Sequence, residues 1–236
     1  MLRNELIKKS PLRILEKSTH DGVGAGNIGV LAARKGVGKT ACLVHIATDQ
    51  LLQKKHVIHV SFASDTSHIV AWYEDIFKEI AQRYKLDNYD ELHDESTRNR
   101  VIMNFKQYGD TVSKVQNGIR ALVKDGHFSA DMIIVDGFDF SKSSPEEFQV
   151  FKNLAEELNI EVWFSATVRR DDNKTDENGI PLILKSFQDN IAILIQMEPH
   201  DTHVHLHLIK DHDIIPAKDD LHLKLDPQTL LIAEEG

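Results

Sequence analysis

The most constraining feature of the sequence is a short segment in which an apolar run leads through a glycine- and lysine-containing loop into a helical pattern. Residues 28–32 read Ile-Gly-Val-Leu-Ala, which suits a buried strand. Residues 33–40 read Ala-Arg-Lys-Gly-Val-Gly-Lys-Thr, and residues 40–54 place apolar side chains at helical spacing. A buried strand that passes through a tight loop into a helix is typical of α/β proteins.

The same alternation continues along the chain. Further strand-like runs are expected at residues 56–62, 101–105, 131–136 and 161–167, and helices at residues 65–84, 111–124, 144–158 and 182–189. After the last helix only strand-like runs remain, at residues 191–197, 202–210, 221–225 and 230–233. Buried strands that alternate with helices indicate parallel pairing, whereas consecutive strands indicate antiparallel pairing. The sequence therefore predicts an α/β fold with a mostly parallel central sheet and antiparallel C-terminal strands.

Length and composition fit one domain. The chain has 236 residues, of which 41% are hydrophobic and 28% are charged, a balance typical of globular proteins. We expect an N-terminal segment at residues 1–20, a single nucleotide-binding domain at residues 21–236 and a polar insertion near residues 85–99. The N-terminal segment either packs on the domain or forms a basic amphipathic contact with a partner or a membrane surface.

The start of the chain and its apolar runs bear on location. Charged residues follow Met1 and Leu2 almost at once, and no stretch approaches the roughly 18 apolar residues of a membrane span. We therefore expect no signal peptide, no membrane span and a cytoplasmic protein. The sole cysteine, Cys42, is expected to be a small buried residue, because one cysteine makes neither an intramolecular disulfide nor a thiolate metal site.

The loop at residues 33–40 resembles the phosphate-binding pattern G-x-x-x-x-G-K-[ST], with Ala33 in place of the first glycine. Successive backbone N–H groups in such a loop form a concave anion site at the positive end of the following helix. Gly36 and Gly38 allow positive φ angles and close approach by phosphate oxygens. The residues expected to contact the phosphates are Arg34, Lys35, Gly36, Val37, Gly38, Lys39, Thr40 and Ala41.

Three side chains are candidates for the chemistry at this loop. Lys39 would reach the β- and γ-phosphates, and the Thr40 hydroxyl would join the shell of a Mg²⁺ ion. Asp136 follows a buried strand and would hold the same ion through water, whereas Asp139 is better explained as a turn or cap residue. The sequence therefore predicts a site for ATP and Mg²⁺, with Thr40 and Asp136 at the metal.

At this point the chain resembles the RecA/KaiC/DnaB group of P-loop ATPases, and most closely single-domain KaiC-like members. The resemblance covers roughly residues 12–233 and rests on the glycine-containing turn at residues 21–26, the loop at 33–40, the strands ending at Asp136 and Thr167, and the C-terminal strands. It implies a three-layer RecA-like fold and a homo-oligomer, possibly a ring, with ATP at the subunit interface. It also implies that Lys210 reaches the nucleotide of a neighbouring subunit, although position 212, where a second cation is usual, is His.

The main departure from the family pattern follows the second strand. Ala63 and Ser64 stand where the family has acidic residues, one of which activates the attacking water. Neither side chain is a general base at neutral pH. Asp65, one or two residues later, either replaces the missing acid or caps the following helix. Slow or absent ATP hydrolysis is the consequence.

The strand at 161–167 and the loop after it suggest a nucleotide sensor. Ser165 and Thr167 could sense the γ-phosphate, and Arg169 or Arg170 could respond by moving the loop at residues 169–180. This loop is acidic and the chain has a net charge of −9, so nucleic acid is not expected to be the main ligand. A protein partner remains open.

Four functional classes stay open. The first is a slow ATPase or nucleotide-controlled oligomeric switch, and the second is an interaction module that binds ATP without hydrolysing it. A ParA/MinD-like ATPase is the third, although Arg34 stands where that family has its signature lysine. A nucleotide kinase is the fourth, but no arginine-rich lid supports it.

Three histidines alternate with apolar residues near the C-terminus. Alternation places His203, His205 and His207 on one face of a strand and their neighbours on the core face. Two or three imidazoles could bind Zn²⁺ or Ni²⁺, or could make an interface sensitive to pH near 6–7; a simple polar outer face is the plainer interpretation.

Overall fold

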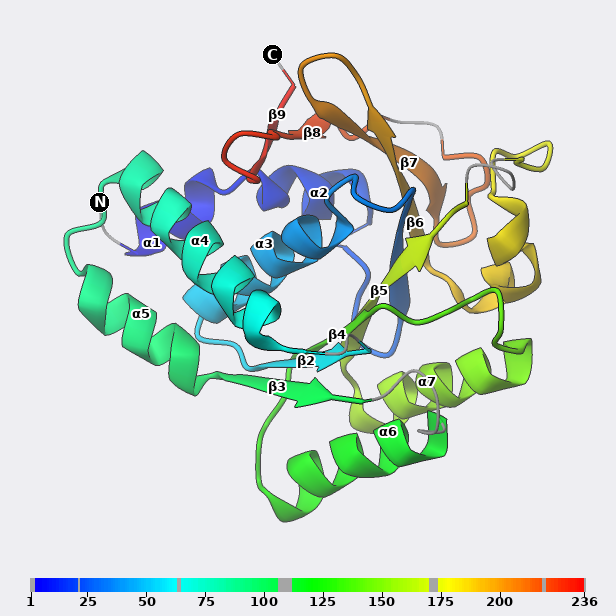
Figure 1. The fold of residues 1–236 in the computed structure, drawn as a ribbon, viewed down its shortest axis with the longest axis horizontal. Coiled ribbons are helices and arrows are strands. Elements are labelled where there is room, and N and C mark those ends of the chain that lie inside the picture. The colour runs from blue at the N-terminus through cyan, green and yellow to red at the C-terminus, as the bar shows by residue number, and fades with distance from the viewer. Residues whose placement is uncertain are drawn as a thin grey trace.

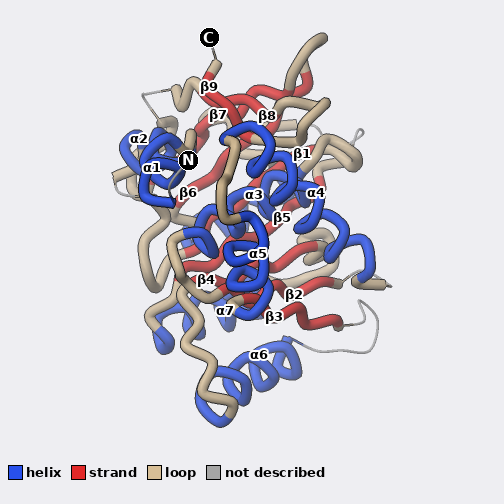
Figure 2. Tube along the Cα trace, turned by 90° about the vertical axis from the view of Figure 1, so that its left-hand side faces the viewer, coloured by secondary structure: helices blue, strands red, loops and turns tan. Residues whose placement is uncertain are grey.

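The computed structural model describes residues 3–20, 22–62, 65–105, 112–169, 174–217 and 220–235. Within these ranges a nine-stranded sheet lies between two layers of helices (Figure 1). The strand order is β3-β2-β4-β5-β1-β6-β7-β8-β9, and Figure 2 shows the strands rising from β3 near the bottom to β7, β8 and β9 at the top. The architecture confirms the α/β class predicted from the sequence.

The strands from β3 to β6 in this order pair in parallel, and β6 to β9 pair antiparallel. The predicted antiparallel C-terminal end is therefore confirmed. The strands are β1 (Ile28–Ala33), β2 (Val57–Ser61), β3 (Arg100–Asn104), β4 (Met132–Asp136), β5 (Glu161–Thr167), β6 (Ile193–Pro199), β7 (Val204–Asp211), β8 (Leu223–Leu225) and β9 (Ile232–Glu234).

Helices cover both faces of the sheet. The first face carries α1 (Arg3–Lys9), α2 (Leu12–Ser18), α3 (Lys39–Leu52), α4 (Ser67–Tyr84) and α5 (Tyr89–Arg98). The second face carries α6 (Val112–Arg120) with a π-helical extension η1 (Ala121–Asp125), α7 (Pro145–Leu158) and the 3₁₀ helix η2 (Leu182–Asn190). Every residue of β1 is buried, as expected for a parallel strand with helices on both sides.

Two segments whose packing the sequence left open contribute to the core. Leu6 of α1 and Leu12 and Leu15 of α2 are buried in the cluster that also contains α3. Within the polar stretch near residues 85–99, α5 buries Leu92 in the same cluster. Among the described helices none is long and apolar enough to cross a membrane.

The C-terminal hairpin of β8 and β9 packs against the beginning of the domain. The backbone N–H of Ile232 donates a 2.8 Å hydrogen bond to Nδ1 of His45, a buried residue of α3. Burial lowers the pKa of His45 to about 3, so this nitrogen stays an acceptor at neutral pH. Leu225 of β8 lies against Gly38, at the start of α3. The hairpin therefore supports the helix that follows the glycine- and lysine-containing loop.

Candidate functional site

The loop between β1 and α3 lies at the C-terminal ends of the parallel strands. Two of its glycines have backbone angles that favour glycine, with φ of +84° at Gly36 and +113° at Gly38. A Cβ atom at Gly36 would meet nothing within 4 Å, whereas one at Gly38 would lie 2.5 Å from Cδ2 of Leu225. The loop is thus open at Gly36 and tightly packed at Gly38.

The N-terminus of α3 is suited to an anion. Gly38 is its N-cap residue and supplies no side-chain hydrogen bond to the first turn. The N–H groups of a first helical turn have no partner within the helix, and they form the positive end of the helix dipole. Together with the open backbone at Gly36, they form the kind of site that binds phosphate groups.

Lys39 is 8% exposed and folds back onto its own loop. Its Nζ donates hydrogen bonds of 3.0 Å to the carbonyl of Ala33 and 3.1 Å to that of Arg34. Burial lowers the pKa of Lys39 to about 8. The negative charge of Asp136 raises this pKa and so offsets part of the effect of burial. A buried ammonium held only by neutral carbonyls is well placed to exchange them for a phosphate. Ala33 takes part through its carbonyl, so its methyl group does not stand in the way of this contact.

Asp136, at the end of β4, links the loop to the neighbouring strands. Its Oδ2 accepts a 2.8 Å hydrogen bond from the Thr40 hydroxyl, and its Oδ1 accepts one of 2.6 Å from Ser165. The Ser165 hydroxyl in turn accepts a 2.9 Å hydrogen bond from the backbone N–H of Gly137. The structure therefore brings together the two residues for which we predicted a metal-binding role.

The donor set around Asp136 fits magnesium. A threonine hydroxyl and a carboxylate are hard oxygen ligands, which Mg²⁺ prefers, and the ion usually keeps several waters of its own. Ser165, for which the sequence suggested a γ-phosphate sensor, instead holds the second oxygen of Asp136. Thr167, the other suggested sensor, is the exposed last residue of β5.

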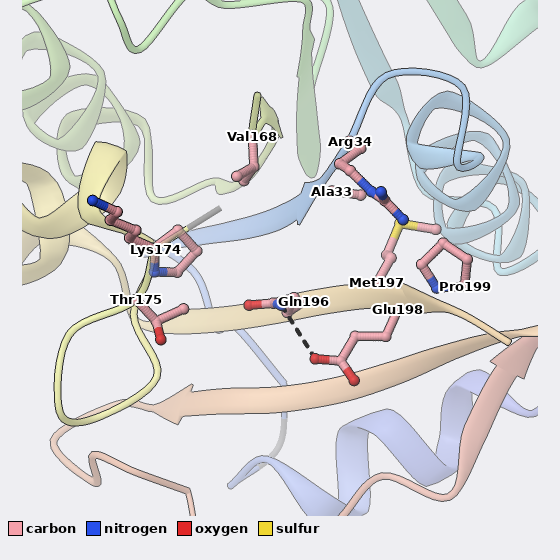
Figure 3. A pocket seen from close by; sticks show the side chains of 10 residues that line it. Ala33, Arg34, Val168, Lys174, Thr175, Gln196, Met197, Glu198 and Pro199 are labelled. Atoms are coloured by element: carbon pink, nitrogen blue, oxygen red, sulfur yellow. Dashed lines mark hydrogen bonds between the residues drawn. The ribbon is translucent and has the colours of Figure 1, made fainter. Parts of the chain in front are cut away.

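A pocket of about 240 Å³ adjoins the loop (Figure 3). Arg34 and Lys174 lie on opposite sides of it, and Gln196 donates a 3.1 Å hydrogen bond to Glu198 at the end of β6. The sequence interpretation missed Lys174, Gln196 and Glu198. Gln196 and Glu198 gave no local signal, because they approach the loop through the parallel pairing of β6 with β1. The lining residues are Ala33, Arg34, Val168, Lys174, Thr175, Pro181, Gln196, Met197, Glu198 and Pro199.

Asp65, the candidate general base, is exposed and bonded within its own turn. One oxygen accepts a 2.9 Å hydrogen bond from the backbone N–H of Ser67, and the other accepts a bond from the Ser67 hydroxyl. These hydrogen bonds lower the pKa of Asp65, which weakens it as a base. Ala63 and Ser64 lie outside the described residues.

Lys210, expected to reach a neighbouring subunit, is directed into its own chain. Its side chain is largely buried, and Nζ donates a 2.6 Å hydrogen bond to the carbonyl of Gln188 in η2. A role in a neighbouring site would require this bond to break. Nη2 of Arg169 donates a 3.4 Å hydrogen bond to the Ser141 hydroxyl. Arg170 lies outside the described residues.

Comparisons with known proteins show the fold. No protein-family model matches the chain, and no curated protein matches it in sequence. Among solved structures, one described as an ATPase domain is similar, with a TM-score of 0.64 and 15% sequence identity over 85% of this chain and 82% of that one. The likeness confirms the RecA-like fold class predicted from the sequence and does not distinguish a KaiC-like subgroup.

Proposed function

We propose that this chain binds ATP with Mg²⁺ on the loop at residues 33–40 and acts as a slow ATPase or a nucleotide-controlled oligomeric switch. The observation that carries the proposal is the joint arrangement of a buried Lys39 and a Thr40–Asp136 pair at a helix N-terminus without a side-chain cap. The RecA-like fold and the similarity to a domain described as an ATPase support it.

Each part of the loop has a distinct task in this proposal. The backbone N–H groups from Arg34 to Ala41 surround the phosphates, and Lys39 exchanges its carbonyl partners for β- and γ-phosphate oxygens. Thr40 supplies a hydroxyl ligand to Mg²⁺, and Asp136 holds the ion through water. The bound ion neutralises phosphate charge.

Slow hydrolysis follows from the surroundings of Asp65. Its carboxylate is engaged by Ser67 and has a lowered pKa, so it is a poor general base. The same observation favours a second candidate, a module that binds ATP without hydrolysing it. Phosphate release from the purified protein separates the two.

The oligomeric part of the proposal rests on the fold. We propose a homo-oligomer whose assembly depends on the nucleotide, with a protein rather than nucleic acid as any further partner. The net charge of −9 disfavours a surface that coats nucleic acid. Light scattering with and without ATP tests the dependence on nucleotide, and an unchanged mass would contradict the switch.

Binding is tested by titrating a fluorescent ATP analogue into purified protein in the presence of Mg²⁺. Lys39→Ala should weaken binding about 100-fold, equivalent to about 2.8 kcal/mol. Lys78→Ala is the control and should bind the analogue like the parent, because Lys78 is an exposed lysine of α4 outside the loop. Asp136→Asn should remove most of the gain in affinity that Mg²⁺ provides. Equal affinity of the Lys39→Ala variant and the parent would refute the proposal.

A further inference from the structure

A second group of ionisable side chains lies on the C-terminal strands and includes no residue of the loop after β1. His205 of β7 is flanked by two carboxylates, Asp220 before β8 and Glu235 after β9. Its Nδ1 lies 2.7 Å from Oε2 of Glu235, and its Nε2 lies 3.4 Å from Oδ1 of Asp220. One ligand atom from each of the three residues can be chosen so that all lie within 4.8 Å of one another.

The hydrogen bonds available to His205 leave one of these contacts unexplained. A neutral imidazole donates from one nitrogen only, and ionised carboxylates only accept. If Nδ1 donates to Glu235, then Nε2 presents a lone pair near the Asp220 carboxylate. A cation between Nε2 and Asp220, either a proton or a metal ion, turns this unfavourable contact into a favourable one.

The separation favours a metal ion over a shared proton. The 3.4 Å between Nε2 and Asp220 is long for a charge-assisted hydrogen bond, which typically spans about 2.7–2.9 Å. With Zn–N and Zn–O bonds of about 2.0–2.2 Å, the edge of a tetrahedral zinc site is about 3.3–3.5 Å. The negative charges of Asp220 and of the nearby Glu235 also balance the charge of a divalent ion.

His203 completes the arrangement. Its Nε2 lies 2.7 Å from Oε1 of Glu235, so both oxygens of Glu235 are held by histidines. Metal-ligating groups commonly have such outer hydrogen bonds, which fix their orientation. The third histidine of the alternating pattern, His207, is separate from the group: its side chain is 50% exposed and its Nδ1 is 4.0 Å from Glu198.

We propose that Nε2 of His205 and the Asp220 carboxylate bind one Zn²⁺ ion, with Glu235 holding Nδ1 of His205, His203 positioning Glu235 and water completing the coordination. The ion would connect β7 to the segment before β8, and the hydrogen bond of Glu235 to His205 would link both to the end of β9. It would thereby fasten the hairpin that carries Leu225 onto Gly38. The proposal is independent of nucleotide binding, and its failure would leave the proposed function untouched.

Another histidine–carboxylate cluster needs no ion. Asp211 accepts from Nδ1 of His20 at 2.6 Å and from Nδ1 of His212 at 2.8 Å, one bond on each oxygen. Two neutral imidazoles satisfy this geometry. Because the same groups could still capture zinc in a titration, the test uses a His20→Gln background; the His20 side chain is exposed and its replacement leaves the core intact.

The experiment is a zinc titration of the purified full chain, stripped of metal, against a chromophoric chelator at about pH 7.5. We expect one Zn²⁺ per chain and a higher melting temperature with zinc than with chelator. His205→Gln and Asp220→Asn should each weaken zinc binding at least about 100-fold, and His203→Gln about 10-fold. His207→Gln, on the same face of the same strand, should change the affinity less than about twofold.

Two results would overturn the proposal. One is the absence of stoichiometric zinc binding. The other is an equal loss in the His207→Gln and His205→Gln variants, which would show diffuse capture by a histidine-rich surface. Melting temperatures in chelator identify any variant that does not fold, and Asp220→Asn, at a partly exposed position, then decides the outcome.

Discussion

The loops after β1 and β4 and the loop after β2 leave the sheet at the same edge, yet different interactions hold them. Ser61, the last residue of β2, is in register with Asp136, so the two loops begin side by side. Asp136 is bonded to Thr40 and Ser165, and Lys39 is buried on its own loop. By contrast, the carboxylate of Asp65 is exposed and bonded only locally, to Ser67. The groups proposed to bind the nucleotide are joined by hydrogen bonds between different strands and loops. Asp65, the candidate for activating water, is bonded within its own turn.

Packed side chains support the loops after β1 and β4. Leu225 of the C-terminal hairpin packs against Gly38 in the loop at residues 33–40. Phe138 and Phe140, directly after Asp136, are buried in an aromatic cluster with side chains of α7 and β5. Buried aromatic pairs of this kind stabilise a loop beyond their area alone. The part of the site proposed to hold the phosphates is therefore held in place by packing within the protein.

The largest effect is expected from breaking the packed loop with Gly38→Ala. The new methyl group would lie 2.5 Å from Leu225, at a φ of +113° that side chains rarely adopt. Backbone strain and overpacking each cost about 1–3 kcal/mol, so the free energy of unfolding should fall by about 2–6 kcal/mol. ATP affinity should fall at least about tenfold because the loop must shift. Chemical denaturation and nucleotide titration measure the two effects.

Gly36→Ala is the matched control for that change. Gly36 also has a positive φ, but its Cβ position is open, so only strain of about 1–2 kcal/mol applies. Because Leu225 is itself buried, Leu225→Ala should cost less stability in the Gly38→Ala background than in the parent protein. Equal stability of the Gly38→Ala and Gly36→Ala variants would show that the hairpin does not hold the loop.

The local parts of this arrangement could be predicted from the sequence, and the long-range parts could not. An apolar run before the loop, helical spacing after it and an aspartate at the end of a buried run identify Lys39, Thr40 and Asp136 without a structure. The contact of Leu225 with Gly38 depends on the register of a hairpin nearly the whole chain away. No local pattern encodes that register.

The same reasoning applies to the pocket and to the proposed zinc ligands. Glu198 comes near the loop because β6 pairs in parallel with β1. Asp220 and Glu235 meet His205 because β7, β8 and β9 pair in sequence. The alternating histidines indicated the outer face of a strand, but only the structure separates His205 from His207.

A smaller effect is expected from pH, acting on the buried ammonium of the same loop. Burial lowers the pKa of Lys39 to about 8 in the free protein, and bound phosphates would raise it again. Binding therefore takes up a proton above pH 8, and the affinity for ATP should fall about tenfold between pH 7 and pH 9. Titrations with the ATP analogue across this range measure the slope.

The lowered pKa of Lys39 makes stability rise with pH, whereas it makes ATP affinity fall. This difference serves as a control for unfolding. A lysine whose pKa is lower in the folded than in the unfolded protein makes stability rise with pH between about 8 and 10.5. Lost affinity near pH 9 would therefore not reflect unfolding through this group. Lys39→Arg, which keeps its charge throughout, should bind ATP with no such slope. A persistent slope in that variant would assign the titration to another group.

The smallest effect is expected from changes to Asp65. They test most directly whether the loop after β2, unlike the loops after β1 and β4, lacks a functional group. Serine can replace aspartate as the acceptor for the N–H of Ser67 but is not a general base, whereas alanine is neither. If Asp65 only shapes the start of α4, the Asp65→Ser variant should release phosphate within about twofold of the parent rate. The Asp65→Ala variant should then mainly have a lower melting temperature, by about 2–4 °C. A loss of tenfold or more in the serine variant, with an unchanged melting temperature, would make Asp65 the base. The loop after β2 would then have to rearrange when ATP binds, because in the structure its carboxylate is held by Ser67.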